Sequence, residues 1–155
     1  MGASTDWTQT KAGTEIVLMA AGSSSAVSDG AFAECTSDDL QPADVDGAEF
    51  ALFEFDAGGT FSAAPTTSGT INVYEQTINS DGNDAPDVDA NYKHDYIGSF
   101  SIDPADVAQY KAAVFPINYF GGKYWVEWLD NGGTAQLSAG WELRATPLYA
   151  GLKTA

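Results

Sequence analysis

Residues 49–56 read EFALFEFD, and this stretch decides the fold class. Apolar and polar residues alternate along it with a period close to two, which is typical of a β-strand with one buried face. The alternation predicts that Phe50 and Leu52 face the core, while Glu49 and Asp56 mark the ends of the strand. Its three phenylalanines also favour a strand, because aromatic side chains pack well on a pleated surface.

Similar short runs occur on both sides of this stretch. They are separated by clusters of Gly, Pro, Asp, Asn and Ser, and no segment sustains the 3.6-residue apolar period of a helix. The sequence therefore predicts an all-β fold, a two-sheet antiparallel sandwich with jelly-roll-like connectivity. The further predicted strands are 14–19, 28–36, 70–77, 95–102, 112–118, 122–129, 134–139 and 141–148.

Three local features refine this prediction. In strand 70–77 one face carries Ile71, Val73 and Glu75, a mixture that predicts partial burial. The Asp-Asn-Gly-Gly sequence at 130–133 predicts a hairpin turn. One short helix is expected near 104–110, because Asp103 can cap it and a proline suits its first position.

The 155 residues are predicted to form one domain. Hydrophobic residues make up 44% of the chain, which is enough for a packed core. Residues 1–12 are expected to be an N-terminal arm, possibly flexible, in which Trp7 is a candidate anchor on a neighbouring subunit, and residues 13–155 the sandwich. A frayed terminus is the alternative for the arm.

The charge balance disfavours some classes of binding partner. Twenty-two acidic residues against 6 basic ones give a net charge of -16, which repels nucleic acid and anionic membranes. An acidic surface that serves solubility alone is the alternative to a role in recognition. No targeting signal or long apolar run is found, so synthesis in a cytoplasm without standard export is expected. The single cysteine, Cys35, is expected to lie half-buried in a strand.

A search for catalytic residues predicts that the chain is not an enzyme. His94 is the only histidine, so any Ser-His-Asp triad or histidine-rich metal centre would depend on this residue. No Gly-x-Ser-x-Gly element, phosphate loop or cysteine-based zinc spacing is present. No cofactor is therefore expected.

The polar segment 79–91 is the one candidate for a metal site. Its oxygen-bearing side chains are spaced in the partly alternating manner of calcium loops, although the glycine position and the closing glutamate of an EF-hand are missing. A solvated hairpin tip is the preferred interpretation, and calcium binding is the alternative. The candidate ligands are Asp81, Asn83, Asp84, Asp87 and Asp89.

Aromatic residues gather in the C-terminal third of the sequence. They suggest either a platform that stacks on sugar rings or the packing of a core or subunit interface. Strand alternation divides the tryptophans of 122–129 between two faces, which favours packing over a sugar platform. The cluster comprises Tyr119, Phe120, Tyr124, Trp125, Trp128 and Trp141. Together with the arm residue, the interface candidates are Trp7, Tyr119, Phe120 and Trp128.

Three segments of the chain carry a resemblance to a known group of proteins. The first runs from Phe50 to Tyr74, with the core TFSAAPTTSGTINVY at 60–74. The second is YIGSF at 96–100, and the third runs from Leu137 through WELRATPL at 141–148. In these segments the chain resembles small structural proteins of tailed bacteriophages, of the head decoration or cement type.

The resemblance implies a virion protein with no catalytic residue. It implies a capsid decoration protein that binds the major capsid protein and stabilises the shell, and a homo-oligomer, possibly a trimer. A tail-associated or glycan-binding sandwich module is the alternative.

Overall fold

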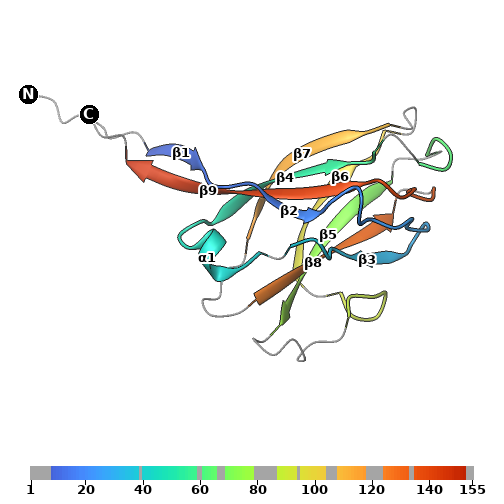
Figure 1. The fold of residues 1–155 in the computed structure, drawn as a ribbon, viewed down its shortest axis with the longest axis horizontal. Coiled ribbons are helices and arrows are strands. Elements are labelled where there is room, and N and C mark those ends of the chain that lie inside the picture. The colour runs from blue at the N-terminus through green and yellow to red at the C-terminus, as the bar shows by residue number, and fades with distance from the viewer. Residues whose placement is uncertain are drawn as a thin grey trace, which may run out of the picture.

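The computed structural model places two antiparallel β-sheets face to face (Figure 1). The sandwich encloses one main hydrophobic core. The all-β, two-sheet antiparallel sandwich predicted from the sequence is therefore confirmed. The structure describes residues 8–38, 40–58, 61–65, 69–78, 87–93, 95–103, 108–117, 124–132 and 135–152.

The first sheet has the strand order β1-β9-β4-β7, and β2 also pairs with β9. All of its pairings are antiparallel. Both β1 and β2 lie along the edge of β9 that faces away from β4, and Gly13 between them donates its N–H to the Pro147 carbonyl at 2.7 Å. The strands of this sheet are β1 (Thr8–Ala12), β2 (Ile16–Met19), β4 (Phe50–Asp56), β7 (Tyr110–Pro116) and β9 (Glu142–Leu152).

The second sheet has the order β3-β8-β5-β6 and is also antiparallel throughout. Its centre is the long pair of β5 and β8, in register from Thr70↔Gly132 to Ile78↔Tyr124. Its strands are β3 (Phe32–Glu34), β5 (Thr70–Ile78), β6 (Asp95–Ser101) and β8 (Tyr124–Gly132).

A two-stranded arm extends from the first sheet. The pairing of β4 with β9 ends at Phe50↔Leu148, whereas β9 continues to Leu152 with β1 alone beside it. Figure 1 shows this ribbon projecting from the body of the sandwich. The described part of the arm predicted over residues 1–12 is thus strand β1, which the sequence analysis did not predict. We call Thr8–Ala12 and Leu148–Leu152 the arm.

The core reverses the predicted orientation of β4. Ala51, Phe53 and Phe55 are fully buried, whereas Phe50 is exposed and Leu52 is half-buried. The Phe53 ring contacts Phe115 of β7 with centroids 5.6 Å apart. The prediction that Phe50 and Leu52 face the core is therefore wrong, because the larger apolar set and the charged pair Glu54 and Asp56 lie on opposite faces.

Strand β5 is more deeply buried than predicted. Ile71, Val73 and Glu75 are all buried, so the expected partial exposure of this face is wrong. A register shift against β6 between Val73 and Tyr74 marks an irregularity of the ladder, and Tyr74 and Gln76 beyond it are buried too. On the outer face of β5, Tyr74 is buried because it packs with Val88 and Phe32.

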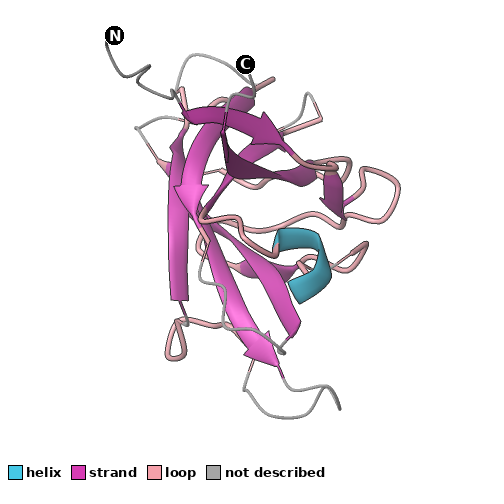
Figure 2. Ribbon diagram, turned by 90° about the vertical axis from the view of Figure 1, so that its left-hand side faces the viewer, coloured by secondary structure: helices cyan, strands magenta, loops and turns pink. Residues whose placement is uncertain are grey.

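The local predictions around the helix and the last hairpin need correction. The described helix is α1 (Pro42–Val45), beside the sheets in Figure 2, where Gln41 donates its N–H to the Asp44 carboxylate at 3.3 Å. Of the helix predicted near 104–110, residues 104–107 lie outside the described residues, and Tyr110 already belongs to β7. In the part of the chain that the structure describes, no helix has the length and apolarity of a membrane span.

The predicted turn at 130–133 is strand as far as Gly132. Asn131 is fully buried there, and its side-chain amide donates hydrogen bonds to the carbonyls of Val27 and Ala135, both at 2.9 Å. The segment predicted as strand 134–139 instead contributes Leu137 to isolated bridges with Val27 and Phe61. The Asn131 side chain thus connects the end of β8 to Val27 and Ala135.

Candidate interaction surfaces

The outer face of the first sheet is apolar at the end near the arm. The strand register sets Phe50 of β4 between Pro116 of β7 and Leu148 of β9, and pairs Leu52 with Val114. Phe50 is 47% exposed and Val114 is 54% exposed. The outer face of a sandwich is ordinarily polar, so neighbouring exposed apolar residues on it mark a candidate contact surface.

An apolar groove lies where β4 begins and β9 continues into the arm. Its volume is about 610 Å³, and most of its lining is apolar. Beyond Leu148 the edge of β9 that faces this groove has no strand partner among the described residues. The groove therefore offers both apolar side chains and a strand edge to a bound segment. We call it the apolar groove; it is lined by Gly47, Glu49, Phe50, Val114, Leu148, Tyr149 and Ala150.

The opposite end of this outer face is charged. Tyr110 donates a hydrogen bond to the Glu54 carboxylate, and Arg144 pairs with Glu142. The hydrogen bond to Glu54 is the main reason that the pKa of Tyr110 is raised above its usual 10.0, and partial burial and the negative charge of Glu54 add to the rise. These groups satisfy one another on an exposed face, which is the ordinary state of a sandwich surface.

A second groove, of about 370 Å³, lies on the other side of the base of the arm. Tyr149 spans the two, because it lines both grooves and donates its hydroxyl proton to the Asp44 carbonyl at 2.7 Å. The acidic residues Glu15, Asp38 and Asp44 line this second groove and are exposed. We call it the acidic groove; its other lining residues are Gly13, Thr14, Ile16, Ala43 and Tyr149.

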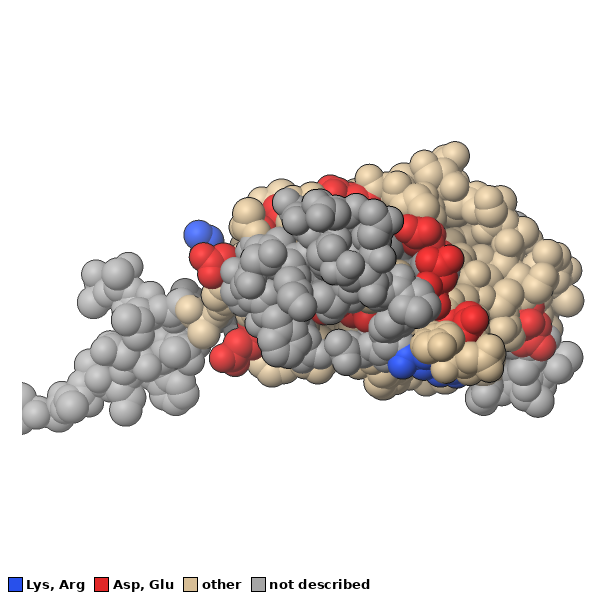
Figure 3. Space-filling view, turned by 90° about the horizontal axis from the view of Figure 1, so that it is seen from below, with Lys and Arg blue, Asp and Glu red and all other residues tan. Residues whose placement is uncertain are grey.

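Acidic residues are widespread on the molecule. Figure 3 shows Asp and Glu recurring over the face seen from below, with few Lys and Arg among them. This distribution agrees with the net charge of -16. A partner of like charge is therefore repelled by this face.

The outer face of the second sheet carries an aromatic cluster. The Tyr74 ring lies 6.3 Å from Phe32 and 5.6 Å from Tyr96, centroid to centroid. The ammonium of Lys93 lies over the Phe32 and Tyr74 rings at 5.6 Å and 5.8 Å. Tyr96 is 54% exposed. We call Phe32, Tyr74, Lys93 and Tyr96 the aromatic cluster.

Polar groups border the aromatic cluster. Asn72 donates its side-chain amide to the Asp130 carboxylate at 3.0 Å, and Lys93 lies 4.0 Å from the same carboxylate. Tyr96 and Ser99 share a hydrogen bond of 2.8 Å through their hydroxyls. An exposed tyrosine beside carboxylate, amide and hydroxyl groups is a combination that suits sugar rings.

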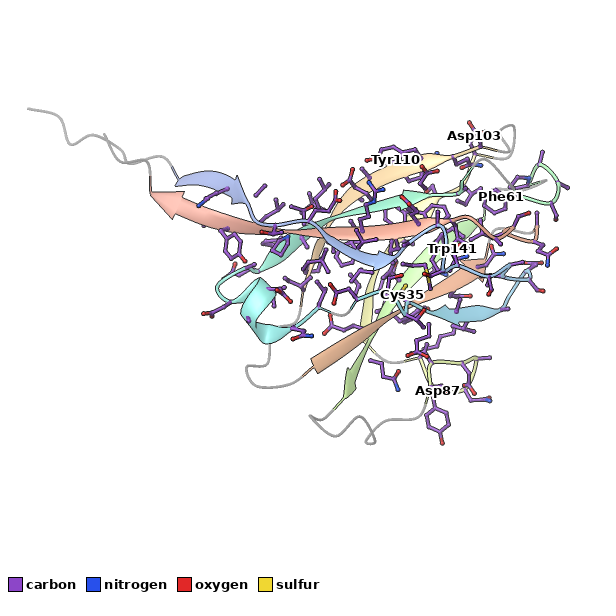
Figure 4. All side chains as sticks on the ribbon, viewed as in Figure 1. Cys35, Phe61, Asp87, Asp103, Tyr110 and Trp141 are labelled. Atoms are coloured by element: carbon purple, nitrogen blue, oxygen red, sulfur yellow. The ribbon has the colours of Figure 1, made fainter. Side chains whose placement is uncertain are left out.

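The candidate calcium loop lies partly outside the described residues. Asp81, Asn83 and Asp84 are not described, while Asp87 is exposed on the side of the sandwich away from Tyr110 (Figure 4). Asp89 accepts the N–H groups of Asn91 and Tyr92 at 2.6 Å and 2.8 Å, which uses one carboxylate oxygen to shape a turn. Within the described ranges no group of three or more His, Cys, Asp and Glu side chains is placed to hold a metal ion.

Most of the predicted aromatic interface lies outside the described residues. Trp7, Tyr119 and Phe120 lie outside them, as does His94. Trp128 lies in β8, where its backbone pairs with Tyr74 on one side and Glu34 on the other.

Trp141 and Cys35 both lie in the core. Trp141 is fully buried and donates its indole N–H to the Ser25 carbonyl at 2.8 Å, which agrees with core packing, one of the alternatives that the sequence left open for the aromatic residues. Cys35, labelled with it in Figure 4, is fully buried, where the sequence predicted half-burial.

The residues of the apolar groove were missed by the sequence analysis. The sequence predicts that Phe50 lies in the core, and it predicts only strand structure for Val114 and Leu148. The available signal was the charged pair Glu54 and Asp56, which shares alternate positions with Phe50 and so places it on the outer face. An exposed apolar residue on that face then indicates a contact surface.

The chain was compared with three groups of known proteins. Family models, curated proteins and solved structures all gave no match. The resemblance to phage structural proteins therefore rests on its three sequence segments. Their described parts include β4 and β5, then β6, then Leu137 with most of β9.

Proposed function

We propose that this chain is a virion structural protein of a tailed phage, a capsid decoration protein that binds the major capsid protein and stabilises the shell. The proposal requires no catalytic step. The observation that carries it is the apolar groove, whose exposed Phe50 and Val114 lie beside an edge of β9 that no described strand pairs with beyond Leu148. An extended segment of a partner can add to that edge and cover the apolar side chains.

We also propose that the sandwich is a jelly roll, and the strand order supports this. When β1 and β2 are counted as one interrupted strand, the eight strands follow the orders 1-8-3-6 and 2-7-4-5 in the two sheets. This is the order that two Greek keys produce in a jelly roll, an architecture common in viral capsid and lectin domains. Since fold alone does not fix function, the groove and the sequence resemblance carry the role.

The test uses phage particles that lack the protein, incubated with the purified chain and separated by sedimentation. We expect the chain to sediment with particles, and cryo-electron microscopy to show density on the head lattice. Val114→Glu places a charge in the apolar groove and should abolish binding, whereas Tyr96→Glu on the other sheet should leave it unchanged. Density confined to the tail, or equal binding by both variants, would contradict the proposal.

Glycan binding is a second candidate function, supported by the aromatic cluster. Its exposed Tyr96 and the Asn72–Asp130 pair offer a stacking surface and hydrogen-bonding groups. A glycan array tests it: binding that Tyr96→Ala or Trp128→Ala abolishes, and that the exposed-tyrosine control Tyr110→Ala retains, supports this function. An array without signal excludes it for the glycans displayed.

A further inference from the structure

The arm carries no acidic residue, although the chain as a whole is acidic. No Asp or Glu occurs between Asp6 and Glu15, and none follows Glu142. Its basic residue is Lys11, one of the 6 of the whole chain. The arm therefore presents one cation without a neighbouring carboxylate on either of its strands, on a protein of net charge -16.

Lys11 lies on the arm in a position to reach a partner. It is exposed in β1, and the register Lys11↔Tyr149 places it on the side of the ribbon that carries Tyr149. None of the ion pairs between described side chains involves Lys11. Its charge is thus available for a contact outside the chain.

The acidic groove lies next to this cation along the chain. Glu15, four residues after Lys11, lines the groove together with Asp38 and Asp44. The Lys11 ammonium on the arm and the carboxylates of the acidic groove are complementary in charge. A twofold axis that passes near the base of the arm can satisfy both contacts at once, since each copy supplies the same pair of features.

We propose that two copies of this chain associate through their arms, with Lys11 of each copy in the acidic groove of the other. The net charge of -16 opposes the association of two copies, and the acid-free arm with its exposed Lys11 can approach an acidic groove without like-charge repulsion. The outer edge of β1 is also unpaired in the described structure and is open to main-chain hydrogen bonds. The geometry supports a dimer in place of the trimer that the sequence resemblance implies.

The proposal does not depend on capsid binding. Self-association is measured on the purified chain, whereas decoration is measured on particles and through the apolar groove. A chain that is monomeric but binds phage heads would contradict only the dimer. A dimer that does not bind phage heads would contradict only the decoration role.

Sedimentation velocity of the full chain over a concentration series tests the proposal. We expect a dimer whose dissociation constant rises with salt, because unlike charges at an exposed contact are screened. Lys11→Glu should raise that constant about 10- to 100-fold, since both symmetric contacts become repulsive. Lys93→Glu, a matched reversal on the second sheet, should leave the constant within about twofold of wild type.

A charge exchange separates a specific contact from general repulsion. Glu15→Lys alone should weaken the dimer, and the double variant with Lys11→Glu should recover most of the affinity at the same net charge as wild type. Circular dichroism of every variant confirms folding. A monomer at about 100 μM in low salt, an oligomer other than a dimer, or a double variant as weak as Lys11→Glu overturns the proposal.

Discussion

Replacing Gly98 of β6 with a larger residue should destabilise the protein, because the new side chain would meet Phe115 of β7. A Cβ atom at this position would lie 2.4–2.6 Å from three ring carbons of Phe115. That is about 1 Å short of ordinary van der Waals contact, so the ring must move. It has little room, because its centroid lies 5.2 Å from that of Phe100 and 5.6 Å from that of Phe53. We therefore expect Gly98→Ala to lower the free energy of unfolding by about 1–3 kcal/mol.

Urea denaturation followed by tryptophan fluorescence measures this loss, and a double-mutant cycle assigns it. Phe115→Leu alone should cost about 1–2 kcal/mol through lost burial, yet it opens space for the new methyl group. The double variant should then lose less than the sum of the single losses, by about 1 kcal/mol. Gly22→Ala is the matched control, because a Cβ there meets nothing within 4 Å. Additive losses, or a Gly98→Ala variant as stable as wild type, would refute the steric explanation.

Two further predictions concern the faces of the first sheet. Phe53→Ala should cost about 3–5 kcal/mol in urea denaturation because its ring is fully buried. Phe50→Ala should cost less than about 1 kcal/mol, and equal losses would mean that β4 faces the other way. The pKa of Tyr110 is raised, so the stability that its neutral hydroxyl gives by bonding Glu54 is present below pH 10.0 and is lost as pH rises through the folded pKa. Tyr110→Phe should abolish this alkaline loss and remove one late-titrating tyrosine from the absorbance titration, and an unchanged titration would count against the hydrogen bond.

The sequence predicts strands where apolar residues alternate, but it does not always predict which face of a strand is buried. In EFALFEFD both sets of alternate positions contain large apolar residues, so period two alone leaves the buried face open. Glu54 and Asp56 hold the missing information, because charged residues rarely occupy a sandwich core. The two deeply buried phenylalanines, Phe53 and Phe55, therefore lie opposite to the predicted side.

Elements held by distant partners were not predictable. TQTKA at Thr8–Ala12 has no apolar alternation, and it is a strand because the far end of β9 supplies a hydrogen-bonding edge. α1 is a single turn fixed by Pro42 and the capping carboxylate of Asp44, too short for any periodic signal. The two grooves depend on the same long-range pairing, so sequence patterns alone did not locate them.

The two grooves at the base of the arm should respond differently to salt. Contacts through Phe50 and Val114 in the apolar groove draw on burial of apolar surface, which salt weakens little and some salts strengthen. Contacts between Lys11 and the acidic groove draw on charge pairing at an exposed site, which salt screens. Tyr149 lines both grooves, so a change at this residue mixes the two effects and cannot separate them. A salt series on wild type does separate them, because capsid binding through the apolar groove should persist under conditions in which the arms of two copies no longer hold together.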